Sequence, residues 1–455
     1  MPVRLIDSLT TNPQVDDVFS DSSVLQAMVR FEVALARVEG RLGIIPAAAA
    51  EAIQRAAAAE KLDAAALAAA TLQSATPAIP FVKQLTDQIH SVDAAAAGFV
   101  HWGATSQDLC DTAMVLLLQK VQAMFASDLD RLEASLTGLS NKHAHTVMLG
   151  RTLLQPATPI TFGLKAAGWL GAIHRARKHV DHAFVEVRVL QFGGASGTLA
   201  ALGDRGLEVA EALARELDLT LPEAPWHVHR DRLATLLTSC GVLVGILAKM
   251  ARDIILLMQP EVGEAREASA EGRGGSSTMP HKQNPVGCTL TLAAANRTPG
   301  LIANYLSGMA QEHERAAGAW QAEWSTIADV MSATGMAIAS MAVVAEGLHV
   351  NVSKMRANID ATQGRIFSER AMILLGTKMG RDVAHKLVEG ATRRSAEQCR
   401  GLKDVLSEMK AVKEHMSPQD LNALDDPEKY LGSAEAFRQH LMASVEKDQR
   451  KKEKG

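Results

Sequence analysis

The segment Gly272–Pro285 carries the side chains with the clearest chemical potential in this chain. Its sequence is Gly-Arg-Gly-Gly-Ser-Ser-Thr-Met-Pro-His-Lys-Gln-Asn-Pro. Clustered glycines give a mobile backbone that can close over a ligand, and two adjacent hydroxyls follow at Ser276 and Ser277. Lys282 and Asn284 add a cation and an amide that suit an anion. The segment is typical of a catalytic loop for a carboxylate substrate, and a plain Gly- and Pro-rich connection between helices has the same composition.

A second candidate stretch, His101–Asp108, reads His-Trp-Gly-Ala-Thr-Ser-Gln-Asp and stands just before a long segment with helical periodicity. Thr105 and Ser106 can bind an anion through their hydroxyls and through the amides of the helix N-terminus that they precede. An ordinary helix cap uses the same residue types. From these residues alone, both interpretations stay open.

The elements that must position these residues are predicted to be helices. The chain has 455 residues, of which 47% are hydrophobic and 4% aromatic, and this balance favours helices because strands draw on β-branched and aromatic residues. A formal net charge of −4 gives no overall attraction to nucleic acid, so an anionic ligand needs a local cationic pocket. Four isolated cysteines and the absence of a secretory pattern indicate a cytoplasmic protein.

Two uncharged segments, Leu233–Ala248 and Val330–Ala345, fall short of the roughly 20 residues of a membrane span. We expect them to be buried helices of a bundle and to take part in subunit packing. The periodicity of apolar residues predicts helices at Asp111–His143, Pro159–Leu190, Leu207–Leu217, Asp231–Met258 and Pro285–Ala310. Short turns between long helices indicate antiparallel neighbours. We therefore expect an all-α chain, with a long central helical bundle at 111–361 between smaller helical domains at 1–110 and 362–455.

The stretch Gly275–Asn284 resembles the signature Gly-Ser-x-x-Met-x-x-Lys-x-Asn of the fumarase/aspartase superfamily, with every fixed position filled. In that superfamily a base removes a proton next to a carboxylate, the neighbouring leaving group departs, and the carbanion is stabilised as a dianionic aci-carboxylate. The resemblance implies that Ser276 transfers the proton. It implies that Ser277 replaces Ser276 or donates to the oxyanion, and that Lys282 and Asn284 hold the carboxylate.

The resemblance extends to the stretch before the first long helix, which looks like the superfamily's first region. It implies that Thr105, Ser106 and Gln107 contact a substrate carboxylate. For His101 it leaves two readings, a substrate contact or a histidine of the core.

The segment Gly150–Pro159 looks like the superfamily's second region, where most members have Gly-Arg-Thr-His. The histidine position holds Leu153, which cannot move a proton, and the glutamate that partners this histidine in relatives is replaced by Thr289. Amine, amidine and hydroxide leaving groups need a proton, whereas a carboxylate, with a conjugate acid of pKa ~4, does not. The missing pair therefore indicates a carboxylate as leaving group or, in reverse, as nucleophile. Intramolecular attack by a carboxylate produces a lactone.

Further segments are similar to the family of bacterial 3-carboxy-cis,cis-muconate cycloisomerases: Leu190–Gly197, Trp226–Leu233, Gln311–Arg315, Ala322–Trp324 and Tyr430–Gly432. The resemblance implies conversion of 3-carboxy-cis,cis-muconate to 4-carboxymuconolactone in the protocatechuate branch of the β-ketoadipate pathway, without a cofactor. It also implies a homotetramer whose active sites are shared between subunits. Arg151, Gln155 and Arg315 would then bind the remaining charges of a tricarboxylate, since guanidinium groups suit bidentate carboxylate binding.

Two rival interpretations remain beside the cycloisomerase. One is an adenylosuccinate lyase-like enzyme, against which Leu153, Thr289 and the stretch Ala78–Pro80 speak. The other is a non-catalytic structural relative, as lens crystallins are to argininosuccinate lyase. We expect no metal, because the scattered histidines lack carboxylate or cysteine partners at ligand spacing. Nucleic-acid and membrane partners are not expected, and Gln191–Gly197 does not fit a dinucleotide-binding loop.

Overall fold

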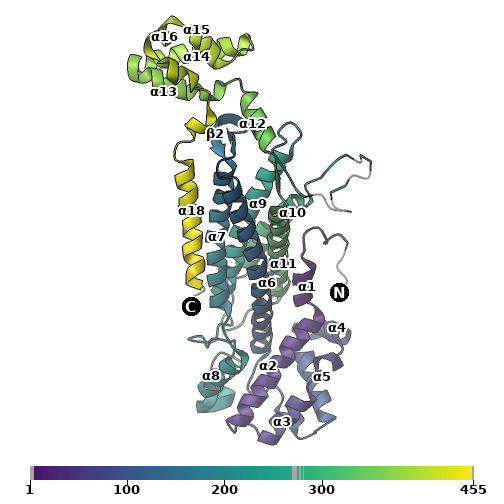
Figure 1. Cartoon of the computed structure of the whole chain (residues 1–455). Helices are drawn as coiled ribbons and strands as arrows, with labels where there is room; N and C mark the ends of the chain where they lie inside the picture. The colour runs from purple at the N-terminus through teal and green to yellow at the C-terminus, as the bar shows by residue number, and fades with distance from the viewer. Residues whose placement is uncertain (1–4, 269–273, 276–277, 280, 453–455) are drawn as a thin grey trace. The chain divides into compact units, whose positions relative to one another are not determined.

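A computed structural model describes residues 5–268, 274–275, 278–279 and 281–452 of the chain (Figure 1). Helices dominate these residues, which confirms the all-α prediction, and strands occur as two short two-stranded sheets. The α-helices are α1 Pro13–Val18, α2 Asp21–Arg41, α3 Ala47–Ala56, α4 Ala64–Ser74, α5 Ala78–His90, α6 Ser106–Lys142, α7 Phe162–Val187, α8 Gly206–Leu217, α9 Asp231–Met258, α10 Val286–Ser307, α11 Ala319–Glu346, α12 Val352–Asp360, α13 Ser368–Met379, α14 Arg381–Glu397, α15 Leu402–Glu408, α16 Lys410–His415, α17 Pro418–Asn422 and α18 Ala434–Lys452. The strands are β1 Val147–Thr152, β2 Gln155–Thr161, β3 Ala265–Arg266 and β4 His349–Val350. Short 3-10 segments are η1 Ala59–Lys61, η2 Ala96–Phe99, η3 Ala200–Arg205, η4 Arg365–Phe367 and η5 Pro427–Tyr430.

Contacts within the chain divide it into two compact units. Unit 1 comprises Met1–Asp130, Arg175–Ala248 and Thr289–Met341, and unit 2 comprises Arg131–His174, Lys249–Cys288 and Ala342–Gly455. The boundaries fall inside α6, α7, α9, α10 and α11. The division into three domains at 110 and 361 stays a prediction.

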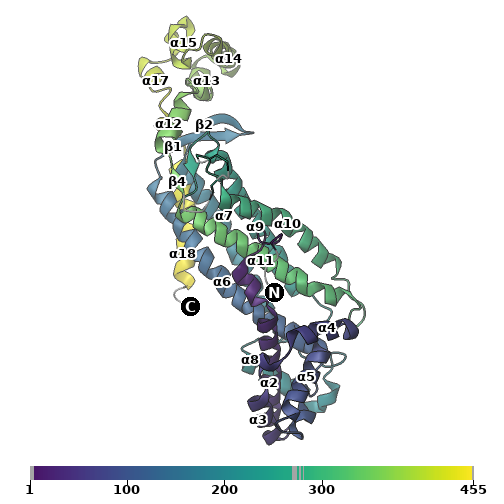
Figure 2. The same ribbon diagram turned by 90° about the vertical axis from the view of Figure 1, so that its right-hand side faces the viewer.

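Unit 1 begins with a group of helices built around α2. Helix α2 packs against α3 and α8, and α4 packs against α5 (Figure 2). The Ser20 side chain caps the N-terminus of α2 by accepting from the Ser23 N–H, and Phe31 and Val38 on its apolar face are fully buried. A Cβ at Gly40 would lie 2.5 Å from the Cβ of Ala50, so glycine is required where α2 and α3 approach each other.

Unit 2 contains the β1–β2 hairpin and the cluster α13–α16 (Figure 1). The hairpin is antiparallel, with Val147 opposite Thr161, Thr152 opposite Gln155, and an irregularity between Leu149 and Arg151. Helix α12 packs on β1. The helix expected from Pro159 therefore starts only at Phe162, because the residues before it pair as a strand.

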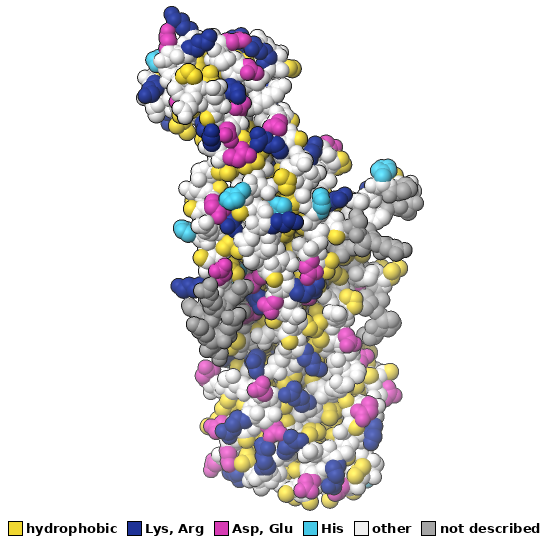
Figure 3. All heavy atoms as spheres, viewed as in Figure 1, with side chains coloured by type: hydrophobic (Ala, Val, Ile, Leu, Met, Phe, Trp, Pro, Cys, Tyr) yellow, Lys and Arg dark blue, Asp and Glu magenta, His cyan; other side chains and the backbone are white. Residues whose placement is uncertain are grey.

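Three of the described helices are long and apolar enough to cross a membrane, namely α6, α9 and α11. Between 50% and 72% of the most apolar 18-residue window of each is buried inside the protein. The two uncharged segments of the sequence thus lie within helices longer than the segments themselves, so length alone does not exclude a span. Figure 3 shows acidic and basic side chains interspersed over the face in view.

Candidate active site

Thr105 and Arg315 meet in unit 1, where the start of α6 lies beside the segment that precedes α11. Arg315 Nη1 donates a hydrogen bond to Thr105 Oγ1 at 2.5 Å. The Thr105 hydroxyl accepts this bond and keeps its own hydrogen for a ligand. Ser106 follows as the first residue of α6, where backbone N–H groups favour an anion. This corner can therefore hold a carboxylate.

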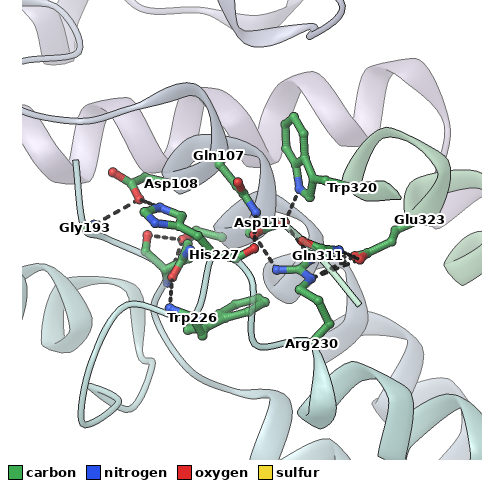
Figure 4. Close-up of polar contacts among 12 residues, drawn as sticks. Gln107, Asp108, Asp111, Gly193, Trp226, His227, Arg230, Gln311, Trp320 and Glu323 are labelled. Carbon is green, nitrogen blue, oxygen red and sulfur yellow. Dashed lines mark hydrogen bonds and ion pairs between the residues drawn. The ribbon is translucent and has the colours of Figure 1, made fainter. Parts of the chain in front are cut away.

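Asp108 fixes the backbone of this corner from inside. Its buried carboxylate accepts hydrogen bonds from the N–H groups of Thr105 at 3.0 Å, Gly193 at 3.0 Å and Gly194 at 2.9 Å. His227 Nε2 lies 2.8 Å from its Oδ1 (Figure 4). A Cβ at Gly193 would stand 2.6 Å from Pro225, so only glycine allows this approach. The loop at Gln191–Gly197 thus supports the start of α6.

Arg230 is the centre of a buried charge network in the same unit (Figure 4). Its Nη1 donates to Asp111 Oδ2 at 2.8 Å and its Nη2 to Glu323 Oε2 at 2.6 Å. The Trp226 ring lies 4.7 Å from the guanidinium carbon, and Trp320 Nε1 donates to Asp111 Oδ1 at 2.9 Å. Burial raises the pKa of Glu323, and the Arg230 guanidinium opposes that rise.

Two glutamines connect this network to the carboxylate corner. Gln107 Nε2 donates to Asp111 Oδ2 at 3.1 Å and to the His227 carbonyl at 2.7 Å. Gln311 Nε2 donates to Glu323 Oε1 at 2.8 Å. Both amide hydrogens of Gln107 are therefore donated inside the protein, so Gln107 supports the corner, and its contact with substrate stays a prediction.

His101 lies in the same unit and has an acidic partner. Its Nδ1 is 2.6 Å from Glu32 Oε1, and the Glu32 side chain is buried in α2. The backbone at His101 has φ +60°, which is uncommon for a residue with a side chain. Burial lowers the pKa of the imidazole, but the Glu32 charge, its hydrogen bond and the Asp108 charge outweigh burial and raise it.

Arg151 and Gln155 lie in the hairpin of unit 2. Arg151 donates from Nη1 and Nη2 to the two oxygens of buried Glu264, at 2.9 and 2.7 Å. Gln155 is exposed. Leu153 and Leu154 form the tip between the strands with φ +50° and +64°, and the Leu153 side chain is 96% exposed.

The signature loop is described only in part. Ser276 and Ser277 lie outside the described residues. The Asn284 N–H donates to the Gly274 carbonyl at 2.8 Å, and the Lys282 side chain is exposed. The loop leads into α10, whose first N–H groups are capped by buried Glu267, with Gly287 N at 3.0 Å and Cys288 N at 2.9 Å from its carboxylate.

The structure brings Thr105 into contact with Arg315 within unit 1. It also places Gln107 in the hydrogen-bond network around Arg230. Sequence reasoning missed Glu32, Asp108, Asp111, Arg230 and Glu323, although Trp226–Leu233 and Ala322–Trp324 had been marked by resemblance. The available signal was a charged residue among the apolar positions of a helical period, as at Glu32 in α2 and Glu323 in α11, because such a side chain is rarely buried unless paired.

Comparisons with known proteins extend over nearly the whole chain. A family model described as "Lyase" matches residues 8–300, and one described as "Adenylosuccinate lyase C-terminus" matches residues 364–441. A 3-carboxy-cis,cis-muconate cycloisomerase from Bradyrhizobium diazoefficiens is 46% identical over 94% of this chain and 95% of its own length. The crystal structure of the 3-carboxy-cis,cis-muconate lactonizing enzyme from Pseudomonas putida matches with a TM-score of 0.92 and 43% identity, covering 97% of this chain and 99% of that one. The chain belongs to the 3-carboxy-cis,cis-muconate cycloisomerase family. A nitrosuccinate lyase from Streptomyces davaonensis is 40% identical over 94% of this chain and 92% of its own length.

Membership of the cycloisomerase family gives the hairpin tip a chemical meaning. The tip carries Leu153 at the position where most members of the wider superfamily have a proton-donating histidine. An exposed leucine supplies no proton, so the hairpin of this family member cannot provide a general acid from that position.

Proposed function

We propose that the protein is a 3-carboxy-cis,cis-muconate cycloisomerase, an intramolecular lyase that forms 4-carboxymuconolactone in the protocatechuate branch of the β-ketoadipate pathway. The observation that carries the proposal is the full-length similarity to cycloisomerases, together with Leu153 at the hairpin tip. A carboxylate nucleophile or leaving group needs no general acid at neutral pH. The similarity to a nitrosuccinate lyase makes nitrosuccinate the second substrate to test.

The proposed reaction closes a lactone ring and consumes one proton. One substrate carboxylate attacks the conjugated double bond and forms the C–O bond of the lactone. The electron pair moves toward the carbon next to another carboxylate, which becomes a dianionic aci-acid. That carbon then takes one proton, so a trianion and a proton give a dianionic lactone.

Roles for the chain's residues follow from this sequence of steps. Ser276 delivers the proton, and Ser277 serves as its substitute or as an oxyanion donor. Lys282 and Asn284 stabilise the aci-carboxylate, because fixed donors and cations at developing charge lower the barrier.

The remaining carboxylates belong to a second set of residues. Arg315, Thr105 and Ser106 form the corner in unit 1 that suits a carboxylate. Arg151 and Gln155 remain candidates from the hairpin, although the Arg151 guanidinium already binds Glu264.

We also propose that the protein is a cytoplasmic homotetramer with active sites shared between subunits. The free thiols of Cys110, Cys240, Cys288 and Cys399 suit a reducing compartment. Helix α9 has Val242 59% exposed within an apolar stretch, a feature that fits burial against another copy.

The test is turnover of purified protein with 3-carboxy-cis,cis-muconate, followed as loss of the conjugated-diene absorbance and as lactone by NMR. We expect rapid loss with this substrate and none with adenylosuccinate or nitrosuccinate. Ser276→Ala should lower kcat by about 10²-fold or more, as expected for loss of a proton-transfer group. Ser135→Ala, on the exposed face of α6, is the control and should leave kcat unchanged. Turnover of nitrosuccinate alone, or full activity of Ser276→Ala, would contradict the assignment.

A further inference from the structure

Helix α2 carries two buried carboxylates one heptad apart, Glu32 and Glu39. Of the two side chains, only that of Glu32 has a hydrogen-bond partner among the described residues. Its Oε1 lies 2.6 Å from His101 Nδ1, whereas neither oxygen of Glu39 has a hydrogen-bond partner among the described residues. A charge is rarely buried without a compensating group, so the pairing of Glu32 with an imidazole sets it apart from its neighbour on the same helix.

The backbone around His101 is held in an unfavourable conformation. His101 has φ +60° and Gly103 has φ +72°, and a Cβ at Gly103 would lie 2.8 Å from the Leu202 side chain. A left-handed conformation at a residue with a side chain is unfavourable and persists only where the surroundings impose it. The short bond to Glu32 is one such constraint, because it fixes the ring that this backbone carries.

The two charges with the largest effect on His101 are acidic and come from two elements. Glu32 projects from α2, and Asp108 lies in the first turn of α6. Both favour the protonated ring, against the opposing effect of burial, and the pKa of His101 is raised as a result. The ring is therefore easier to protonate than an ordinary imidazole, and its Nε2 has no hydrogen-bond partner among the described residues.

His101 stands four residues before Thr105, whose hydroxyl is bonded to Arg315. We propose that Glu32 is a positioning residue that orients His101 through Nδ1 and keeps its imidazolium Nε2–H available as a second cation for a substrate carboxylate. The inference rests on the proposed function, since it takes the ligand to be a tricarboxylate with more negative charge than one guanidinium can match. Glu32 itself does not touch substrate.

The expected pH dependence follows from the protonated form. The imidazolium is present below the folded-state pKa of His101 and is lost as pH rises through it, so substrate affinity falls on the alkaline side. Removing the Glu32 charge lowers that pKa and moves the loss to lower pH. If Glu32 only stabilised the fold, its removal would not be expected to move the pH at which substrate affinity is lost.

The test compares Glu32→Gln with Glu39→Gln, a buried glutamate on the same helix that does not contact His101. Deuterium exchange at the imidazole Cε1 position, read by mass spectrometry, gives the titration midpoint of His101 in the intact protein. We expect Glu32→Gln to lower this midpoint by about one pH unit or more, and Glu39→Gln to leave it unchanged.

Kinetics supply the second readout. In Glu32→Gln the alkaline limb of kcat/KM for 3-carboxy-cis,cis-muconate should shift to lower pH by about one unit, which is about a tenfold loss on that limb, carried mainly by KM. His101→Gln, which removes the imidazole and keeps Glu32, should abolish this limb. An unchanged His101 midpoint, an unchanged limb in Glu32→Gln, or a wild-type limb in His101→Gln would each overturn the proposal.

The two proposals can fail separately. If the protein leaves the muconate unchanged, the proposed function fails, while the exchange measurement still decides whether Glu32 holds the charge on His101. If turnover is normal and the midpoint does not move, the function stands and the role of Glu32 is wrong.

Discussion

Buried charges in unit 1 are satisfied to very different degrees. Arg230 is bonded to two carboxylates and covered by an indole ring, and Asp108 accepts bonds from three backbone N–H groups. Glu39, at the other extreme, is fully buried with no partner for either oxygen among the described residues. Burial raises the pKa of Glu39 to about 8, with a contribution from Glu32. Glu39 is therefore a neutral acid at physiological pH.

This neutral acid makes stability depend on pH. In the unfolded chain Glu39 ionises near its ordinary pKa of 4.5, while in the folded protein it stays protonated up to about pH 8. Between these values the unfolded state releases a proton that the folded state keeps, so the free energy of unfolding falls as pH rises. Glu39→Gln cannot ionise. It should match wild type at pH 4.5 and exceed it by on the order of 3 kcal/mol at pH 8.

The measurement is denaturant unfolding of both proteins at pH 4.5 and 8, at one protein concentration because assembly affects apparent stability. Glu51→Gln, an exposed position of α3, is the control and should show no pH-dependent difference. Equal stability of Glu39→Gln and wild type at both pH values would mean that Glu39 is solvated or paired in solution.

Residue-level chemistry was partly visible in the sequence. Thr105 and Arg315, 210 positions apart, were both singled out as carboxylate ligands, and the structure joins them by a hydrogen bond. The Glu32–His101 pair was not foreseeable, because the spacing of 69 residues carries no pattern and each residue alone fits an ordinary helix or loop. Only the fold brings the two side chains together.

At the scale of elements, the β1–β2 hairpin is the feature that differs most from expectation. Residues 155–161 read Gln-Pro-Ala-Thr-Pro-Ile-Thr, and two prolines argue against a strand inside a sheet. A two-stranded hairpin has only edge strands, and proline is tolerated there. The rule that excludes proline from the interior of a sheet therefore did not apply to these residues. The long helices were predicted well because their apolar period extends over many turns, and α9 has the predicted bounds.

The hairpin is tied to its unit by the Arg151–Glu264 pair. Arg151→Met would leave the Glu264 carboxylate buried with Asn358, at 2.7 Å, as its remaining side-chain donor in the described part of the chain. Loss of one partner of a buried pair costs about 3–5 kcal/mol, so we expect a clear fall in the unfolding midpoint. Arg131→Met is the matched control, since the Arg131–Glu346 pair is 44% and 40% exposed and should contribute under about 1 kcal/mol.

Thermal unfolding and substrate kinetics together separate the two roles of Arg151. A supporting role predicts loss of stability in Arg151→Met with a modest change in KM. A ligand role predicts the reverse, with stability equal to that of Arg131→Met and KM raised at least tenfold. The second pattern would support Arg151 as a direct substrate contact.

At the scale of the whole molecule, the exposed apolar surface of α9 fits the proposed assembly with further copies of the chain. Helix α9 is apolar enough to cross a membrane, and half of its most apolar window is buried within the chain. Val242 lies exposed on this helix. Assembly with further copies of the chain would remove such a surface from water at about 25 cal/mol per Å².

Val242→Arg tests the proposed assembly directly. Light scattering after gel filtration should give wild type at four times the chain mass of 48.5 kDa, and the variant at a lower mass. The arginine places a charge in a closed apolar contact, where an unpaired charge is strongly unfavourable. Arg252→Ala, an exposed change further along α9, should not alter the mass. A monomeric wild type, or a tetrameric variant of unchanged stability, would contradict the proposed interface.

The Arg230 network has a consequence for redesign of the substrate range. Gln107 donates to one of the two carboxylates that bind Arg230, and Gln311 donates to the other. The start of α6 and the segment before α11 are therefore both attached to the Arg230 guanidinium. Substitutions in one segment will change the constraints on the other, and their effects will not add. Libraries that vary Thr105 and Arg315 in combination should therefore yield active variants that stepwise searches miss.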